Sequence, residues 1–329
     1  MKTSLAERVL PVAFLTSLDR ILEANNKRRA SHPGTVCSLE TRRERRLILR
    51  RCFAELWEIG FRLKRPGALG DRHIQALATR WYEEGLVVAS WHNRISILRT
   101  FSEWIQKPGM VRDVQDYFQG IDTTRVTAAQ TNRAWQPNGV MPEDVIEQAR
   151  QLDERLALYL ELQFEFGLRV KESIEMRPAH CLVESGKAIE IYEGTKGGRL
   201  RRVDILNDDQ RRVFDMARDV AARTRSGRLR WNDLTWRQAQ RRFYYQMNKL
   251  GITRKQLGIT AHGLRHGYAQ DRYRDLTGQP PPLMVGEGKL IDRDAHHQAG
   301  IQVARDLGHG RPGVSTSYYG THGHSLRKS

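Results

Sequence analysis

The stretch ITAHGLRHGYAQDRYRDL, residues 259–276, has the pattern of a helix that carries two basic side chains near its start. His262 and Arg265 stand three positions apart, a spacing that places both side chains on one helix face. An imidazole beside a guanidinium can hold an anion, but a single His-x-x-Arg pair is too common to specify a function. Its meaning depends on what the rest of the chain supplies.

The composition of the 329-residue chain predicts an anionic partner. Lys and Arg number 55 against 38 Asp and Glu, which gives a formal charge of +17. Such a surplus repels itself in a compact fold and is typical of proteins that bind nucleic acid, so double-stranded DNA is the expected partner. No run of 18 apolar residues is present, and residues 10–18 are interpreted as one face of a short helix. No membrane partner is therefore expected.

Cysteine and histidine usage predicts no metal site and no cofactor. The chain has three cysteines that lie far apart, Cys37, Cys52 and Cys181. Their odd number and wide spacing predict buried thiols in a reducing cytoplasm, without a disulfide framework or a cysteine-based zinc site. Five histidines lie near the end of the chain: His296, His297, His309, His322 and His324. Neither a His-Glu-x-x-His sequence nor a carboxylate-rich motif accompanies them, so a metal site is the weaker interpretation.

The first part of the chain predicts a small helical domain over residues 1–118. Apolar residues recur at helical spacing in residues 38–63, and the sequence KRPGALGD then breaks the pattern. Two further helices are predicted over residues 71–84 and 90–105. Side chains off the apolar stripes form the expected DNA-binding set: Arg42, Arg43, Arg45, Arg46, His92, Asn93, Arg94 and Arg99. A solvated helix face is the alternative interpretation of the arginine-rich block.

The second part of the chain predicts a mainly α fold with one small antiparallel β-sheet, an α+β arrangement. Residues 119–142 are polar, rich in threonine and closed by prolines, which is typical of a linker. A helical pattern resumes at residue 143 and is interrupted near Gly167, and residues 182–205 then alternate as short strands with glycine-containing turns. Residues 209–250 are helical again, so residues 143–329 form the second predicted domain.

Six side chains of this second domain match a single chemical need. In chain order they are Arg169, Lys196, His262, Arg265, His309 and Tyr318, with Tyr319 beside the last. Direct attack on a phosphodiester builds up negative charge at phosphorus, which forked arginines can stabilise without a metal. A general acid must protonate the departing 5′ oxygen, and a tyrosine oxygen can conserve the bond energy as a covalent ester. His262 and Arg265 would then hold the phosphate that is cleaved.

The order of these side chains resembles that of the tyrosine recombinases, or phage integrases. The sequence FGLRVKES resembles their first-arginine motif, with Arg169 as a catalytic arginine and Glu172 as the acidic residue that supports it. Lys196 resembles the lysine of the family's β-hairpin, and HGLRH resembles the His-x-x-Arg box that supplies His262 and Arg265.

The resemblance leaves two tyrosines open as the nucleophile. LGH matches the third box of the family at His309, and the family's tyrosine follows that histidine by nine positions, which gives Tyr318 (309 + 9 = 318). Tyr319 is the second choice because the sequence GRPGVST can hide a one-residue insertion.

The resemblance also implies an architecture and an activity. It implies a helical, SAM-like core-binding domain in residues 1–118, a linker in 119–142 and a tyrosine-recombinase catalytic domain in 143–329. It implies a metal-independent, site-specific DNA recombinase that works through a covalent 3′-phosphotyrosine and integrates or excises a mobile element. Such an enzyme acts as a homo-oligomer that forms a tetrameric synapse on its recombination site. Its expected location is the bacterial cytoplasm. Its tail, THGHSLRKS, can dock on a neighbouring protomer.

Two other functions share part of this pattern. A non-catalytic basic DNA-binding protein explains the charge but not the ordered motifs, and a type IB topoisomerase shares the chemistry without exchanging DNA partners. The chain departs from the family in one spacing: the 44 residues from Arg265 to His309 (309 − 265 = 44) are more than is usual. The additional residues include LTGQPPPLMVGEGKLIDRD, which predicts an extra loop near the site.

Overall fold

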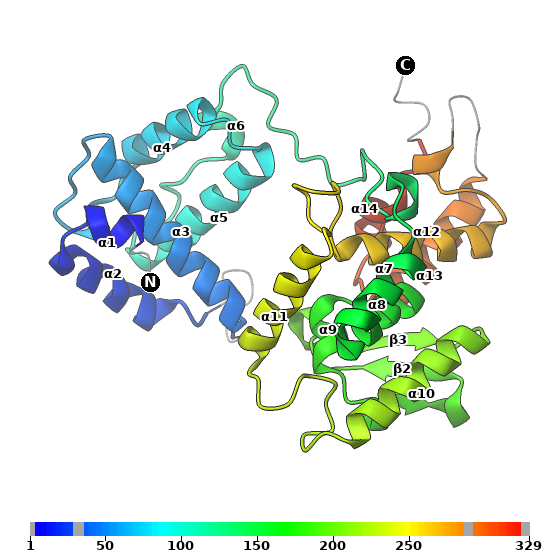
Figure 1. Cartoon of the computed structure of the whole chain (residues 1–329). Helices are drawn as coiled ribbons and strands as arrows, with labels where there is room; N and C mark the ends of the chain where they lie inside the picture. Colours follow the sequence, from blue (N-terminus) through cyan, green and yellow to red (C-terminus); the bar gives the residue numbers. More distant parts are fainter. Residues whose placement is uncertain (1–3, 29–35, 286–291, 324–329) are drawn as a thin grey trace. The chain divides into compact units, whose positions relative to one another are not determined.

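The computed structural model describes residues 4–28, 36–285 and 292–323. The chain divides into two compact units, Met1–Arg125 and Val126–Ser329 (Figure 1). Among the described residues, no helix is both long enough and apolar enough to cross a membrane. The cysteines are buried free thiols, as their spacing predicts.

Helices make up the first unit. They are α1 (Leu5–Val9), α2 (Val12–Asn25), α3 (Leu39–Glu58), α4 (Asp71–Glu83), α5 (Val88–Trp104) and α6 (Val114–Tyr117). Their apolar faces meet in one hydrophobic core, in which Phe53 packs edge-on against Phe14 and Phe101. Helix α3 is shorter than predicted because the chain leaves it at Gly60, whose φ of +95° favours glycine.

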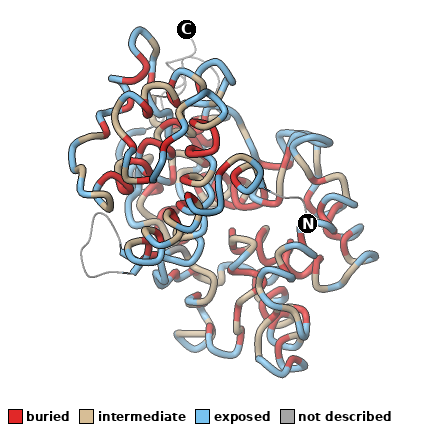
Figure 2. Tube along the Cα trace, turned by 90° about the vertical axis from the view of Figure 1, so that its left-hand side faces the viewer, coloured by how far each residue is buried: buried red, intermediate tan, exposed pale blue. Residues whose placement is uncertain are grey.

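The second unit is also mainly helical. Its described helices are α7 (Pro142–Leu152), α8 (Glu154–Phe166), α9 (Val170–Glu175), α10 (Asp208–Ala222), α11 (Trp236–Lys249), α12 (His262–Thr277), α13 (Arg293–Asp306) and α14 (Thr316–Tyr319). Helix α8 is buried along most of its length, and α7, α10 and α12 pack against it. Figure 2 shows buried residues on the inner sides of the helices and exposed residues on their outer sides. The HGLRH sequence therefore lies on a helix that packs against the centre of the unit.

A small antiparallel sheet completes the second unit. Its strands are β1 (Leu182–Val183), β2 (Ala188–Ile191) and β3 (Arg201–Asp204), hydrogen-bonded in that order. Ile189 pairs with Val203, and both side chains are buried in the core of the unit. The prediction of a mainly α fold with a small antiparallel sheet is confirmed.

The break between α8 and α9 depends on Gly167. Its φ of +57° ends α8, and a Cβ at this position would lie only 2.5 Å from the ring of Tyr268. Glycine therefore satisfies both the left-handed backbone and the close approach of α12. This turn delivers Arg169 to the start of α9.

The predicted linker is anchored to both units. Thr123 belongs to the first unit, where its carbonyl accepts a hydrogen bond from His92 Nε2 at 2.8 Å. In the second unit, the N–H of Ala129 donates to the carbonyl of Thr316 at 3.1 Å, and Trp135 is buried. Residues 124–128 are the part that lies between these anchors, while the domain limits inferred from the sequence stay predictions.

Candidate active site

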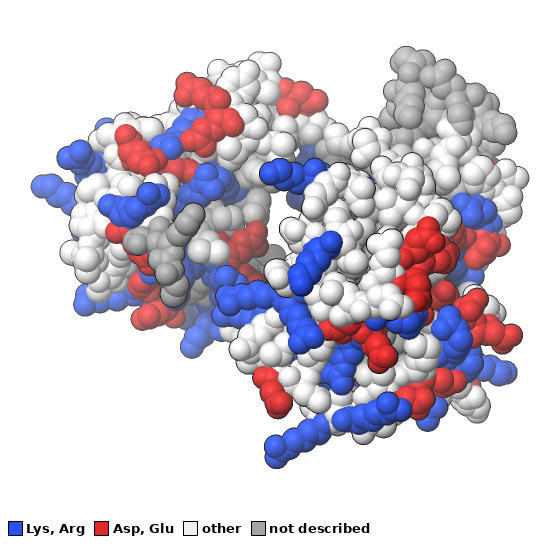
Figure 3. All heavy atoms as spheres, in the orientation of Figure 1, with Lys and Arg blue, Asp and Glu red and all other residues white. Residues whose placement is uncertain are grey.

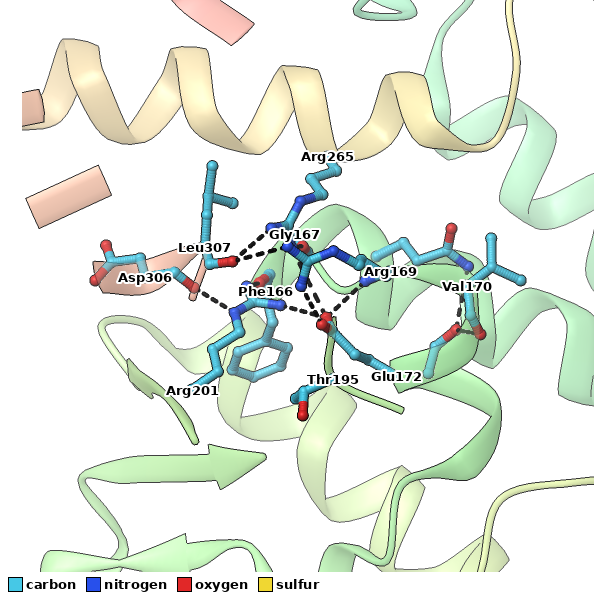
Figure 4. A network of polar contacts seen from close by, with 12 residues as sticks. Phe166, Gly167, Arg169, Val170, Glu172, Thr195, Arg201, Arg265, Asp306 and Leu307 are labelled. Atoms are coloured by element: carbon cyan, nitrogen blue, oxygen red, sulfur yellow. Dashed lines mark hydrogen bonds and ion pairs between the residues drawn. The ribbon is translucent and has the colours of Figure 1, made fainter. Parts of the chain in front are cut away.

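Three arginines converge on one buried carboxylate, that of Glu172 in α9 (Figure 4). Arg169 Nη1 hydrogen-bonds to Glu172 Oε1, Arg201 Nη1 lies 2.7 Å from Oε2, and Arg265 Nη1 lies 3.8 Å from Oε2. Burial alone would raise the pKa of this carboxyl, but the charges of the three arginines outweigh burial and hold the pKa at about 2. Glu172 is therefore an anion at neutral pH and fixes the cations around it.

Arg265 is completely buried, one turn into α12. Its Nη1 donates to the carbonyl of Gly167 and its Nη2 to the carbonyl of Leu307, both at 2.5 Å, and its Nε donates to Tyr318 Oη at 3.2 Å. Burial and the neighbouring charge of Arg201 lower its pKa to about 10, so the guanidinium remains charged at neutral pH. These contacts come from three different parts of the chain and fix the orientation of the guanidinium.

Arg169 occupies the N-cap position of α9 and remains partly exposed. Its backbone N–H donates to Glu172 Oε2 at 2.8 Å, and its side chain keeps 23% of its surface accessible. Its backbone is therefore fixed, while an incoming anion can reach its guanidinium group. Arg169 and Arg265 thus provide two neighbouring guanidinium groups, one open to solvent and one buried.

Arg201 is part of this cluster, although the sequence reasoning did not select it. It is 1% exposed on β3 and donates to Glu172 and to the carbonyls of Phe166 and Asp306. A signal was present in the sequence, because Arg201 alternates with the core residue Val203 and so points to the inner face of the sheet. An arginine at an inward strand position needs a buried anion, and Glu172 is that anion.

The rings of His262 and His309 both lie close to the ring of Tyr318. The ring centroids of His262 and His309 are 5.7 Å and 5.5 Å from that of Tyr318. His309 Nδ1 pairs with Ser315 Oγ at 2.9 Å, and its Nε2 lies 3.4 Å from Arg265 Nη2. Loss of contact with water and the nearby arginine charges lower the pKa of His262 to about 4 and that of His309 to about 3. Both rings are neutral at pH 7 and can accept a proton.

A third imidazole, His266, also lies against Tyr318 and was not selected from the sequence. It is buried on α12, its ring centroid is 4.6 Å from that of Tyr318, and its Nδ1 has no hydrogen-bond partner among the described residues. The signal for it was its position one residue after Arg265 in the HGLRH sequence. Burial and the nearby His262 and Arg133 lower its pKa to about 3.

The two adjacent tyrosines have different surroundings. Tyr318 lies against Arg265 and the histidines, and its hydroxyl accepts the hydrogen bond from Arg265 Nε. Tyr319 instead stacks on Tyr273 with ring centroids 4.9 Å apart, and burial raises its pKa. The structure thus brings Tyr318 together with the other predicted site residues, and it does not bring Tyr319 there.

Lys196 lies in the turn between β2 and β3, at the start of a short 3-10 helix (Lys196–Gly198), but its side chain lies outside the described part of the structure. The turn itself is held close to the arginine cluster. Gly194 has a φ of +80°, and a Cβ on it would lie 2.6 Å from the carbonyl oxygen of Lys171, the residue before Glu172. Backbone contact therefore places the start of this turn against α9, with Thr195 near Glu172 in Figure 4.

Two family models match this chain. One is described as Integrase and matches residues 124–271, and the other is described as Phage integrase, N-terminal, and matches residues 20–110. The chain belongs to the tyrosine recombinase family. The integrase match includes Arg169, Lys196, His262 and Arg265 and ends before His309.

Solved structures of tyrosine recombinases share its fold. A lambda integrase dimer bound to a COC′ core site has a TM-score of 0.57 at 14% identity, over 96% of this chain and 78% of that chain. XerH site-specific recombinase bound to its difH substrate before cleavage has a TM-score of 0.55 at 16% identity, over 96% and 94%. The Tn1549 transposon integrase in complex with transposon right end DNA has a TM-score of 0.54 at 14% identity, over 94% and 97%. No curated protein sequence matches the chain.

The candidate DNA-contact residues of this tyrosine recombinase fall into two groups. Arg43 and Arg46 are exposed on α3. Arg42 is partly buried and donates to the carbonyl of Cys37, and Arg45 is buried and donates to the carbonyl of Arg28. Only the exposed members of this block present free surface to a partner, so the buried Arg45 is not a candidate DNA contact.

The candidates on α5 are largely used inside the first unit. Arg94 is buried, contrary to the expectation that it lies off the apolar stripe, because the buried carboxylate of Glu55 needs a cation. Asn93 is exposed and donates to Glu44 at 2.9 Å, while His92 bonds to a main-chain carbonyl. Arg99 pairs with Asp113 and donates to two main-chain carbonyls. Arg94 is therefore not a candidate DNA contact.

Helix α11 presents a basic surface that the sequence reasoning passed over. No Asp or Glu occurs from Leu234 to Gln270, and Figure 3 shows Lys and Arg side chains over α11. The exposed side chains of this helix and the following loop include Arg237, Arg241, Tyr244, Tyr245, Lys249, Arg254 and Lys255. Cations interleaved with exposed aromatic rings are typical of nucleic-acid surfaces. The absence of acidic residues over this stretch was a signal available in the sequence.

Proposed function

We propose that this protein is a site-specific DNA recombinase that cleaves and rejoins DNA through a covalent 3′-phosphotyrosine, in the integration or excision of a mobile element. One observation carries the proposal. The hydroxyl of Tyr318 is hydrogen-bonded to Arg265, and two neutral histidines and a second guanidinium, that of Arg169, lie around them. This arrangement joins a nucleophile, proton acceptors and oxyanion stabilisers in one place.

The phosphate clamp consists of Arg265 and Arg169. A guanidinium has five N–H groups, and the bonds of Arg265 to Gly167, Leu307 and Tyr318 use three of them, while a fourth faces His309 Nε2 at 3.4 Å. The remaining N–H of Arg265 can bind a non-bridging phosphate oxygen, and the partly exposed guanidinium of Arg169 can bind the same group from the solvent side. Because Arg265 is already fixed, little reorganisation opposes the build-up of charge in the transition state.

Cleavage transfers the phosphoryl group from the DNA 5′ oxygen to Tyr318, with one proton removed and one supplied. The Tyr318 oxygen attacks phosphorus and the P–O5′ bond breaks, so the products are a 3′-phosphotyrosyl ester and a free 5′ hydroxyl. The tyrosine proton passes to a neutral imidazole, that of His262 or His309, and Lys196 supplies a proton to the departing oxygen. Attack by a 5′ hydroxyl on the ester reverses each transfer and rejoins the strand. The chain's own cations provide the electrostatic stabilisation, so we propose a metal-independent reaction.

The proposed partners are double-stranded DNA and further copies of this chain. The surplus of positive charge, the exposed arginines of α3 and the basic surface of α11 support DNA binding. Among proteins with the same fold, lambda integrase has been solved as a tetramer bound to a Holliday junction. We therefore propose that this chain also acts as a tetramer on its DNA.

Trapping the covalent intermediate tests this function. Wild-type protein is mixed, in excess EDTA, with a pool of nicked duplexes whose core sequence is randomised, so that cleavage releases a short fragment and prevents rejoining. We expect a DNA–protein adduct that survives denaturation. Binding to the duplexes without any adduct would favour a non-catalytic DNA-binding protein, and relaxation of supercoiled plasmid without strand exchange would favour a topoisomerase. A strict need for Mg²⁺ or Zn²⁺ would contradict metal independence.

A further inference from the structure

The segment of residues 126–138, here called the strap, lies against the two helices that carry the Tyr318 site. Its Ala129 N–H donates to the carbonyl of Thr316 in α14. Further along, Asn132 forms a pair of side-chain hydrogen bonds with Gln270 of α12, at 2.9 Å and 3.3 Å. The strap therefore bonds to α14 directly and to α12 through its side chains.

Gln270 extends this contact to the nucleophile. Its side chain is 2% exposed, and its Nε2 donates both to Asn132 Oδ1 and to the main-chain carbonyl of Tyr318, each at 2.9 Å. An amide NH₂ has two donors, so these two bonds use both of them. Asn132 thus determines how the amide of Gln270 is turned, and Gln270 in turn holds the backbone of Tyr318.

The strap is itself firmly seated on α12. Trp135 is 1% exposed, and its indole N–H donates to the carbonyl of Thr260 at 2.8 Å. A Cβ at Gly263 would lie 2.5 Å from both the Arg133 carbonyl oxygen and the Trp135 ring, so the strap backbone touches the helix next to His262. A segment fixed this closely can impose a position on what it binds.

Helix α14 depends on such outside support. It spans only Thr316–Tyr319, a single turn, which its own backbone hydrogen bonds cannot hold in water. The strap acts at both ends of this turn, at the carbonyl of Thr316 directly and at the carbonyl of Tyr318 through Gln270. The location of the Tyr318 hydroxyl therefore depends on bonds made from outside its own helix.

We propose that Asn132 and Gln270 are positioning residues for the nucleophile: the strap holds the Tyr318 backbone so that its hydroxyl faces the phosphate clamp. This inference rests on the proposed function, because it assigns the strap a role in the attack by Tyr318. Neither residue touches the reacting atoms. Their loss should slow the attack and leave DNA binding unchanged, since misplacement of a nucleophile by about 1 Å can cost on the order of 10²-fold in rate.

The test compares Gln270→Met, Asn132→Ala and the double variant with wild type in the full-length chain. Gln270→Met fills the same space without an amide, so it removes the two bonds that Gln270 donates and the one that it accepts from Asn132, and it leaves no large cavity. The matched control is Gln210→Met on α10, because Gln210 is also buried and its Nε2 donates to a main-chain carbonyl, that of Glu165 at 2.7 Å. The substrate is a nicked duplex recovered from the randomised pool as a wild-type adduct.

Three quantities are measured: the single-turnover rate of adduct formation, the Kd for the duplex and the melting temperature. We expect Gln270→Met to lower the rate by about 10-fold or more with an unchanged Kd. The double variant should be no slower than Gln270→Met, because both residues act through one contact. If Gln210→Met lowers the melting temperature as much as Gln270→Met does but keeps the wild-type rate, the slower rate of Gln270→Met reflects positioning and not general destabilisation. Equal rates for Gln270→Met and wild type would overturn the inference.

A measurement without DNA separates this inference from the proposed function. Amide hydrogen exchange of peptides that cover residues 315–320 should be faster in Gln270→Met than in Gln210→Met or wild type. If wild type forms no adduct with any duplex of the pool, the proposed function fails, and this exchange still decides whether the strap holds α14. Unchanged exchange in residues 315–320 would overturn the strap's role whatever the outcome with DNA.

Discussion

Glu172 shows how one buried carboxylate can organise a cationic site. Without it, Arg201 and Arg265 would be buried guanidinium groups with no counter-charge, a state that costs several kcal/mol per ion. With it, the three arginines keep a fixed geometry before any phosphate arrives. The resemblance to the recombinase motif predicted a supporting acid at this position, and its partnership with Arg201 became visible only in the structure.

The surroundings of the two tyrosines predict opposite effects of their removal. Tyr318→Phe deletes the hydroxyl bonded to Arg265, so the covalent adduct should disappear while DNA binding persists. Tyr319→Phe deletes a hydroxyl that lies near Gly300, away from the arginines, so the adduct should form. Denaturing gels of trapped adducts and a binding titration check both variants. An adduct in Tyr318→Phe that is absent in Tyr319→Phe would reverse the assignment.

The phosphate clamp predicts that charge alone is insufficient at Arg169 and Arg265. A lysine keeps the positive charge but lacks the planar fork that binds two oxygens, so each Arg→Lys variant should lose about 10²-fold or more in the cleavage rate. Arg265→Lys should also lower the melting temperature, because Arg265 bonds buried carbonyls, whereas the partly exposed Arg169 should affect it less. Single-turnover cleavage and thermal unfolding are the measurements. Near wild-type cleavage by both variants would remove the clamp from the mechanism.

His266 predicts a stability change on acidification. Its folded-state pKa of about 3 lies below the ordinary value of 6.5, so only the unfolded chain takes up this proton as the pH falls below 6.5. Its contribution to the free energy of unfolding is therefore complete above pH 6.5 and falls progressively between 6.5 and 3. Glu165 opposes this trend, since burial and nearby Asp209 raise its pKa to about 7.

The difference between wild type and His266→Gln isolates this contribution. Urea unfolding at pH 7.5, 6.0 and 5.0 should show a smaller loss of unfolding free energy on acidification in His266→Gln than in wild type. A larger loss in the variant than in wild type would contradict the prediction.

The β2–β3 connection contains Lys196 and is held against α9. Contact between Gly194 and the α9 backbone brings the turn to the arginine cluster, which suits a residue that protonates the leaving oxygen. Lys196→Ala should therefore cleave ordinary DNA slowly. A substrate in which sulfur replaces the bridging 5′ oxygen has a leaving group that needs no proton, so it should restore most of the rate. Arg265→Lys should gain no such rescue, and a Lys196→Ala variant that stays equally slow on the sulfur substrate would exclude the acid role.

Helices α3 and α5 show that a basic side chain on a helix can serve the core instead of a ligand. Arg94 lies over the ring of Trp81 and bonds to Glu55, which also accepts from the indole of Trp81. Arg43 and Arg46 are exposed and, among the described contacts, do not bond to a buried carboxylate. Net charge by itself therefore overstates the number of side chains available to DNA.

The two units of the chain predict different salt dependences for fragments. Each phosphate neutralised contributes a slope of about −0.9 to log K against log salt, so a fragment of residues 126–329 should bind DNA with a shallower slope than the full chain. It should also bind more weakly, because linked modules raise each other's effective concentration. A salt titration of both proteins on one duplex measures this, and equal slopes would mean that the first unit does not contact the phosphate backbone.

A second fragment, residues 143–329, serves as the control in that titration. It lacks the strap and Trp135, so it should melt at a lower temperature than the 126–329 fragment. Equal melting temperatures would show that the strap adds nothing to the stability of the second unit.

The sequence by itself determined the fold class and the order of the motifs. Helical and strand periodicities depend on which residues are apolar, and they indicated α2 to α5, α7 to α12 and the three-stranded sheet, whereas α1, α6, α13 and α14 were not predicted. The positions of Arg169, Lys196, His262, Arg265, His309 and the tyrosine pair follow from short motifs whose spacing is written in the chain. Such local patterns survive whatever the tertiary packing is.

Only the tertiary structure decided which of these side chains meet. Tyr318 and Tyr319 are adjacent, and no local pattern says which one faces Arg265, since that depends on how α14 packs on α12 and α13. Arg201 bonds to Glu172, 29 positions away in the chain. Asn132 bonds to Gln270 across 138 positions, and Gln270 bonds to the Tyr318 carbonyl across 48. Periodicity gives the direction of a side chain relative to its own helix or strand, whereas its partner is set by long-range packing.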